Sequence, residues 1–144
     1  MYSRRAKESY RDTISYEADM LAFCAQAVGR EHPTREDLWV YLEGFLLHFR
    51  NLIRVFSGEF HNEQKGDLST ANPRLWLGRE LSLDEMTAIQ APARALDTAY
   101  HQQISKYLQH CTRLRHEYDR TWDVTLMSTQ IRPIITAFED AFPR

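Results

Sequence analysis

Apolar residues return at intervals of three and four positions in four separate stretches of this 144-residue chain. That spacing follows the 3.6-residue turn of an α-helix and collects the apolar side chains on one face. No stretch alternates apolar and polar residues with β-branched side chains over the length of a strand. We therefore expect an all-α protein, an antiparallel four-helix bundle formed as a single domain over residues 1–144.

Capping residues and helix breakers predict where the helices begin and end. Thr34 is placed to cap the second helix, which Gly58 stops. Ser82 and Glu85 form a capping box that starts a third helical region, within which Pro92 either ends a short helix or kinks a long one. The predicted helices are 7–28, 35–57, a region from 82 with a break or kink near 90–92, and a last helix from 119 or 121.

The longest irregular stretch covers residues 58–81, between the second helix and the capping box. Turn-forming residues are frequent in it, yet Phe60, Leu75 and Trp76 are too apolar for a solvated linker. We expect an ordered loop that packs across one end of the bundle and has room for one short helical turn.

Charge and composition exclude several classes of protein. The net charge of −2 argues against a generic binder of duplex DNA or of an anionic membrane, although a local basic groove remains open. No apolar run approaches the roughly 20 residues of a membrane span, and no signal peptide follows the N-terminus. Cys24 and Cys111 stand far apart among apolar residues, which favours two reduced core thiols and a cytoplasmic protein.

The second predicted helix is the most apolar one and should be central to the core, yet it carries polar residues. His48, Arg50 and Asn51 fall within four residues, with His48 on the apolar face. Buried polar groups need partners, so these side chains form either a structural network or a binding site. A charged stripe on a helix can also be its solvated side.

A second polar group occupies one side of the third helix: Gln103, Lys106, His110 and Arg113. We expect His110 to lie near His48, Arg50 and Asn51 where the two helices meet, in one polar cluster inside or beside the core. The alternative is a half-buried histidine that is hydrogen-bonded across the bundle. The six histidines include no pair at i, i+4 and no Glu-x-x-His, so no metal site and no cofactor are expected.

The chain contains the stretch FLLHFRNLIRVF at 45–56, then QISKYLQHCTRLR at 103–115 and a last helix that begins with a tryptophan. This pattern resembles the HEPN domains. These are small helical domains with an Arg-x4–6-His motif, and many are RNA-cleaving toxins or partners of nucleotidyltransferases. The resemblance spans about Leu38 to Phe142. Gln103 stands where the motif has arginine before His110; Arg54 and His61 match the spacing, but Gly58 should break the helix between them.

The resemblance implies a HEPN-like module that binds RNA, a nucleotide or a protein, without strong catalysis because Gln103 brings no charge. The alternative is a metal-independent endoribonuclease with His110 as general acid and base, assisted by Arg50 or Arg113. A third hypothesis is a pure interaction protein. The expected binding residues are His48, Asn51, Gln103, Lys106 and Arg113.

A high aromatic content of 12% also predicts self-association. Trp39, Trp76 and Trp122 fall near helix starts or in the loop, so some rings should reach the surface and form a twofold interface. HEPN domains frequently pair, which implies a homodimer here. A cognate nucleotidyltransferase or antitoxin is a further expected partner, and no membrane is expected.

Overall fold

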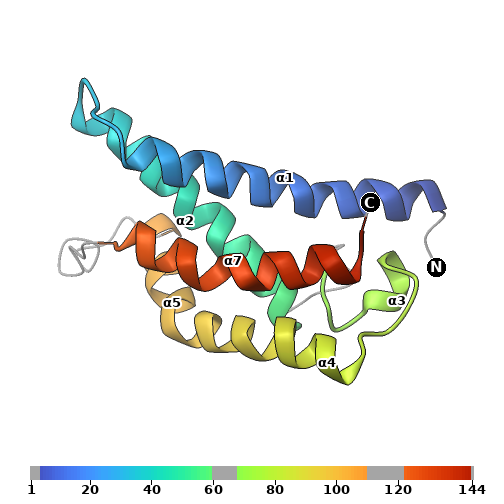
Figure 1. Cartoon of the computed structure of the whole chain (residues 1–144). Helices are drawn as coiled ribbons and strands as arrows, with labels where there is room; N and C mark the ends of the chain where they lie inside the picture. Colours follow the sequence, from blue (N-terminus) through green and yellow to red (C-terminus); the bar gives the residue numbers. More distant parts are fainter. Residues whose placement is uncertain (1–3, 60–67, 110–121, 144) are drawn as a thin grey trace.

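The computed structural model describes residues 4–59, 68–109 and 122–143, and every regular element within these ranges is a helix. The predicted all-α class is therefore confirmed for the described residues. Figure 1 shows the long helices packed against one another, with α7 (Val124–Ala141) between α1 (Arg4–Val28) and α5 (Ala91–Gln109). None of the described helices combines the length and the apolar character that crossing a membrane requires.

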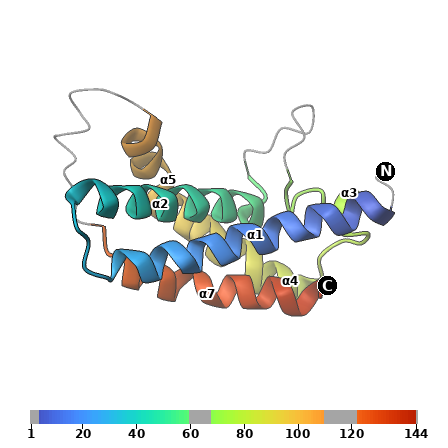
Figure 2. The same cartoon turned by 90° about the horizontal axis from the view of Figure 1, so that it is seen from above.

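The helices α1 and α2 (Arg35–Ser57) form a hairpin along the length of the molecule (Figure 2). Thr34 caps α2 by accepting a hydrogen bond from the backbone N–H of Asp37 at 3.2 Å, as expected from the sequence. The two helices approach closely at Gly44, where a Cβ atom would lie only 2.9 Å from Sγ of Cys24. Cys24 is a buried free thiol, whereas Cys111 lies outside the described residues.

The third helical region is continuous and consists of α4 (Leu83–Glu85), the π-helical turn η2 (Met86–Gln90) and α5. Ser82 and Glu85 form both halves of the predicted capping box. In the π turn the N–H of Ala91 bonds to the carbonyl of Met86, one residue farther back than in an α-helix. Pro92, which lacks an N–H and crowds the carbonyl four residues before it, is thus accommodated without a break in the helix.

Two elements differ from the prediction in ways that have physical causes. The last helix begins at Val124 rather than near residues 119–121, because Asp123 caps it by accepting a hydrogen bond from the N–H of Leu126. The loop contains one short helix, α3 (Pro73–Trp76). Trp76 is only 2% exposed and belongs to the core, whereas Trp39 is 46% exposed, so one of the three tryptophans expected near helix starts or in the loop is fully packed.

The core is centred on α2, as its apolar pattern predicted. Its largest fully buried side chains include four phenylalanines, three of them from α2 and one from α7: Phe45, Phe49, Phe56 and Phe138. The ring of Trp76 stacks on Phe138 with centroids 6.0 Å apart, and its N–H donates to the carbonyl of Ser69 at 2.8 Å. The loop before α4 is thereby packed onto the core.

Two arginines fasten the C-terminal end of the chain. Arg11 is buried, lies over the ring of Phe138 and donates to the carbonyl of Phe142 at 2.8 Å. Arg79 lies 4.3 Å from the centre of the Phe142 ring and donates to the carbonyl of Ala141. Both arginines therefore make structural contacts at the C-terminal end of the chain, and neither belongs to the candidate site described below.

Candidate functional site

Charged side chains of α2 and α5 meet along the contact between the two helices. Arg50 and Arg54 are one turn apart on α2, and Asp97 and His101 are one turn apart on α5. We call these four residues the α2–α5 site. The guanidinium of Arg54 reaches the imidazole of His101: its Nε donates to Nδ1 at 3.2 Å, and its Nη2 also contacts Nε2. Arg54 thus joins the two helices.

The contact with Arg54 sets the protonation of His101. A guanidinium only donates hydrogen bonds, so its contact with the ring favours the neutral imidazole, in which one nitrogen has a lone pair that can accept. Burial lowers the pKa of His101, and the charge of Arg54 lowers it further, against an opposing effect of Asp97. The side chain of His101 is 24% exposed, so a neutral imidazole reaches solvent at this point.

Asp97 is a buried carboxyl whose hydrogen bonding is incomplete. It is 6% exposed, and its Oδ1 has no hydrogen-bond partner among the described residues. That oxygen lies 3.7 Å from Nδ1 of His101, within ion-pair range but beyond hydrogen-bonding distance. Burial raises the pKa of Asp97, while the charges of His101 and Arg54 act in the opposite direction.

Arg50 is the second guanidinium of the site and has an unused donor. Its Nη1 is buried and has no hydrogen-bond partner in the part of the chain that the structure describes. Burial lowers the pKa of Arg50, and the neighbouring charge of Arg54 lowers it further. A buried unbonded donor typically costs about 1–3 kcal/mol, which an anionic ligand would recover.

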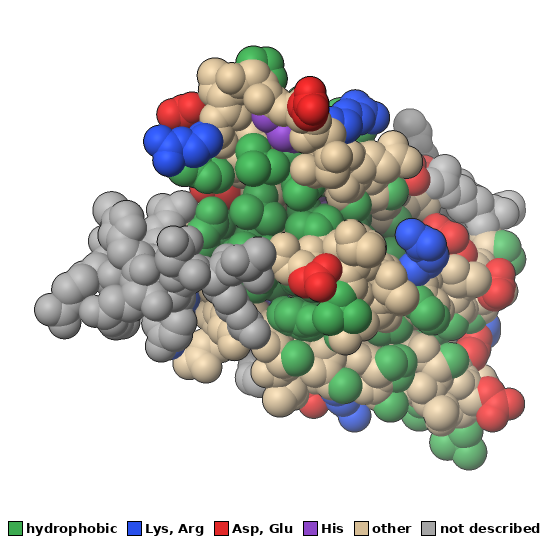
Figure 3. Space-filling model, turned by 60° about the vertical axis from the view of Figure 1, so that its left-hand side comes forward, with side chains coloured by type: hydrophobic (Ala, Val, Ile, Leu, Met, Phe, Trp, Pro, Cys, Tyr) green, Lys and Arg blue, Asp and Glu red, His purple; other side chains and the backbone are tan. Residues whose placement is uncertain are grey.

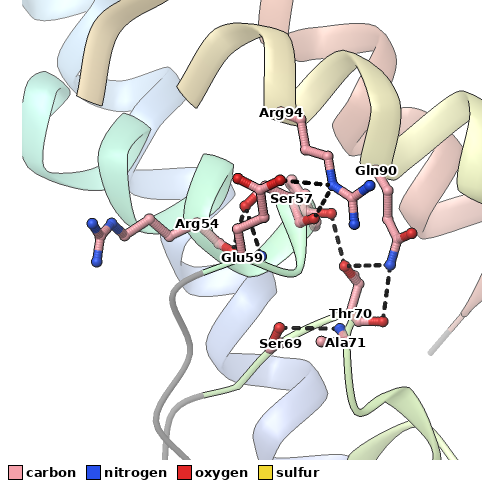
Figure 4. A network of polar contacts seen from close by, with 9 residues as sticks. Arg54, Ser57, Glu59, Ser69, Thr70, Ala71, Gln90 and Arg94 are labelled. Carbon is pink, nitrogen blue, oxygen red and sulfur yellow. Dashed lines mark hydrogen bonds and ion pairs between the residues drawn. The ribbon is translucent and has the colours of Figure 1, made fainter. Parts of the chain in front are cut away.

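The C-terminus of α2 is anchored to α5 beside the site (Figure 4). Its last four carbonyls all accept hydrogen bonds: that of Arg54 from Ser57 Oγ, those of residues 55 and 56 from Thr70, and that of Ser57 from Nε of Arg94. Arg94 also pairs with Glu59 at 3.3 Å. This full set of partners for a helix end fixes Arg94 and the last turn of α2 relative to α5.

Two of the predicted binding residues belong to a different contact. His48 and Asn51 face α1, where Nδ1 of His48 lies 2.6 Å from Glu17 and the amide of Asn51 donates to the same carboxylate at 3.4 Å. The ring of Tyr16 packs edge-on against His48. The expectation that His48 and Asn51 share a cluster with Arg50 at the contact with the third helix is therefore wrong for these two residues, because that side of α2 is covered by α1.

The remaining predicted residues lie on α5 or beyond it. Gln103 and Lys106 are half-buried on α5, and Oε1 of Gln103 is buried without a hydrogen-bond partner among the described residues. His110 and Arg113 lie outside the described residues, so the predicted approach of Arg50 to His110 stays a prediction.

Sequence reasoning missed Asp97 and His101, although a signal for His101 was present. Arg94 and His101 satisfy the Arg-x4–6-His spacing with six residues between them, and both lie within the uninterrupted helix α5. Seven residues correspond to about two helical turns, which places both side chains on one side of α5. Unlike the pair of Gln103 and His110, this pair includes the arginine of the motif.

Charge on the face of the molecule drawn in Figure 3 is mixed rather than segregated. Figure 3 shows one face, on which acidic and basic side chains alternate around a group of hydrophobic ones. An anion is therefore not attracted by a broad basic surface on this face.

Comparisons of the chain with protein families, with curated proteins and with solved structures find no match.

Proposed function

We propose that this chain is a HEPN-like helical module, an antiparallel four-helix bundle, that binds a phosphate group of RNA or of a nucleotide at the α2–α5 site. The observation that carries the proposal is the buried Nη1 of Arg50, which has no hydrogen-bond partner among the described residues and lies beside the charge of Arg54. A phosphate oxygen supplies the missing acceptor and neutralises one of two neighbouring cations. The spacing of Arg94 and His101 supports the HEPN-like assignment.

The charge balance of the site agrees with an anionic ligand. Arg50 and Arg54 contribute two positive charges and Asp97 one negative charge, which leaves +1 with His101 neutral, and the charges of the neighbouring Arg94 and Glu59 cancel. Glu59 is already engaged by Arg94, and Asp97 is buried. The guanidinium of Arg50 is therefore the group best placed to accept a new negative charge.

Binding of a labelled single-stranded RNA oligonucleotide at several salt concentrations tests this function. Arg50→Gln should weaken binding by about 10-fold or more, the value of a hydrogen bond to a charged group, and should reduce the salt dependence. The matched control is Arg132→Gln, which removes an exposed arginine of α7 and should leave affinity unchanged. Equal losses in both variants, or no binding by the wild-type chain at low salt, would contradict the proposal.

A second candidate is a metal-independent endoribonuclease, which the neutral imidazole of His101 favours. Such a base would take the proton of a ribose 2′-hydroxyl as its oxygen attacks the phosphorus. The 5′-oxygen of the next nucleotide then leaves and takes up a proton from water or from the protonated histidine, which yields a 2′,3′-cyclic phosphate and a 5′-hydroxyl. Arg50 would stabilise the charge on the phosphate oxygens.

Incubation of the pure protein with total RNA and a chelator separates the two candidates. Cleavage that is lost in His101→Gln and retained in His110→Ala assigns catalysis to the α2–α5 site, and the reverse pattern assigns it to His110. Loss in both variants indicates that the two histidines act together. No cleavage by the wild-type chain removes the ribonuclease candidate and leaves phosphate binding as the function.

We also propose that the module forms a homodimer through the outer side of the α1–α2 hairpin. Tyr16 and Phe23, two turns apart on α1, are 56% and 49% exposed, and Val40 and Leu47, two turns apart on α2, are 66% and 39% exposed. A twofold axis would pair this patch with its own copy, as closed dimers do. Sedimentation at micromolar concentration tests it: Phe23→Glu should shift the mass towards 17.0 kDa, and a wild-type monomer at every concentration would contradict it.

A further inference from the structure

Asp97 and Arg50 lack opposite kinds of hydrogen-bond partner. Among the described residues, Oδ1 of Asp97 has no donor and Nη1 of Arg50 has no acceptor, and both atoms are buried. Buried polar atoms in folded proteins are nearly always bonded, so two such atoms at one helix contact point to a bound molecule. A molecule that satisfies both atoms has to bring an anionic acceptor and a separate donor.

The two helices of the site run in opposite directions, which fixes the level of Asp97. Arg54 of α2 contacts His101 of α5. Arg94, which comes earlier on α5, donates to the carbonyl of Ser57, which comes later on α2 (Figure 4). Because Asp97 lies between Arg94 and His101 in the sequence, it is level with the last turn of α2. Its Oδ1 is directed at the site, 3.7 Å from Nδ1 of His101.

Arg50 and Asp97 therefore occupy different ends of the site. Arg50 lies about 8 Å from the level of Asp97 along the axis of α2. The charge of Arg50 acts on His101, whereas the charge of Glu59 acts on Asp97. A phosphate is repelled by the two carboxylates and attracted by the guanidinium, so it binds at the end that holds Arg50. The donor of the same ligand then faces Asp97.

We propose that the site is specific for RNA, and that Oδ1 of Asp97 accepts a hydrogen bond from a ribose 2′-hydroxyl of the ligand whose phosphate is bound by Arg50. The inference rests on the proposed phosphate-binding function and adds the class of nucleic acid. A hydroxyl is small enough to reach a carboxyl that is only 6% exposed, whereas the N–H donors of a base belong to a planar ring. The 2′-hydroxyl is also the group that distinguishes RNA from DNA.

The surroundings of Asp97 agree with such a contact. Burial raises the pKa of Asp97, because a carboxylate removed from water is unfavourable. A hydroxyl that donates to the carboxylate offsets this cost without bringing a further negative charge to that end of the site. A DNA strand offers no 2′ donor, so it leaves Oδ1 unbonded.

The affinities of four matched oligonucleotides test the inference. All are single strands of one length with uracil bases, and they differ only in the 2′ group, which is hydroxyl, amino, fluorine or hydrogen. The fluoro probe keeps the sugar conformation of RNA without a donor, and the amino probe keeps a donor without the hydroxyl that cleavage would need. The wild-type chain should bind the two donor probes about 10-fold or more tighter than the other two, the value of a hydrogen bond to a charged group.

Variants assign this preference to Asp97. Asp97→Leu replaces the carboxyl by an apolar side chain of the same branched shape and should bind all four probes equally, with its fold checked by circular dichroism. Asp97→Asn keeps an uncharged acceptor and should retain a smaller preference. The matched control Asp140→Leu removes an exposed carboxyl of α7 and should keep the wild-type preference. Arg50→Gln should weaken all four probes by the same factor.

Each contrary result has its own meaning. Equal affinity of the wild-type chain for the four probes overturns the inference and leaves the proposed function standing, because binding of the phosphate does not require the 2′ group. Tighter binding of the fluoro probe together with the donor probes indicates recognition of sugar conformation and also overturns it. A full preference in Asp97→Leu or in Asp97→Asn overturns the role of Asp97. No binding of any probe overturns the proposed function and this inference together.

Discussion

Replacement of Gly44 by alanine probes the close approach of α1 to α2. The added Cβ would lie 2.9 Å from Sγ of Cys24, whereas nonbonded carbon atoms prefer about 3.5–4.0 Å. Cys24 is 4% exposed, so its thiol has little space into which to move. Overpacking of a core costs about 1–3 kcal/mol, and alanine gains about 1 kcal/mol over glycine within a helix. We expect Gly44→Ala to lower the free energy of unfolding by about 1 kcal/mol.

A double-mutant cycle isolates the steric contribution from helix propensity. In Cys24→Ala the crowding atom is absent, so Gly44→Ala in that background should be stabilising by about 1 kcal/mol. The coupling energy between the two positions is then about 1–3 kcal/mol, the cost of the overpacking. Urea denaturation in the presence of a reductant, followed by circular dichroism, measures each corner of the cycle.

Gly29→Ala is the matched control, because a Cβ there would meet its nearest atom, the carbonyl oxygen of Gln26, at an ordinary 3.5 Å. It should not be destabilised by crowding. Additive effects of Gly44→Ala and Cys24→Ala, or a gain of stability from Gly44→Ala alone, would refute the reasoning that this glycine is required by the packing of the two helices.

Three further predictions concern charged groups. Arg50→Met should leave the free energy of unfolding unchanged or raise it by up to about 1 kcal/mol, because it removes a half-buried cation with a buried, unbonded Nη1; urea denaturation measures this. Burial lowers the pKa of His101, so the folded chain binds fewer protons than the unfolded chain. The free energy of unfolding should therefore fall as the pH drops through about 6.5, and it should fall less in His101→Gln. Thermal melting at pH 7.5 and at pH 5.5 checks this. The hydrogen bond from Arg79 lowers the pKa of Glu85 to about 2. The stabilisation from this ion pair should be lost as the pH falls from about 4.5 towards 2. The free energy of unfolding of Glu85→Gln, measured over the same pH range, should lack that loss.

Much of the fold could be predicted because local signals agree with the tertiary structure. The second helix is expected at 35–57 and observed there, since the side chain of Thr34 caps it and Gly58 adopts the left-handed conformation, with φ of 72°, that ends it. The start of the last helix was placed too early, because Asp119, Thr121 and Asp123 are all acceptable caps by residue type. Only the hydrogen bond to the N–H of Leu126 distinguishes Asp123.

The candidate site was only partly accessible to sequence reasoning. Helical periodicity correctly placed Arg50 and His48 in the most buried helix, but it does not say which neighbour covers each side of that helix. The two residues are separated by two positions, about 200° around the helix axis, so one side chain meets α1 and the other lies towards α5. Asp97 and His101 were missed because the Arg-x4–6-His motif was matched to Gln103 and His110 rather than to Arg94 and His101, which lie nearer the start of α5.

The π-helical turn at Met86–Gln90 has a consequence for how this sequence can diverge. Such a turn holds one residue more than an α-helical turn of the same rise, so it acts as a one-residue insertion that leaves the faces of the helix on either side in register. Removal of one residue within 86–90 would restore α-helical geometry and keep Asp97 and His101 directed at α2, whereas a deletion farther along α5 would rotate them by about 100°. The shortened helix would bring Pro92 against the carbonyl four residues before it, so a related chain that lacks the extra residue is expected to lack the proline as well.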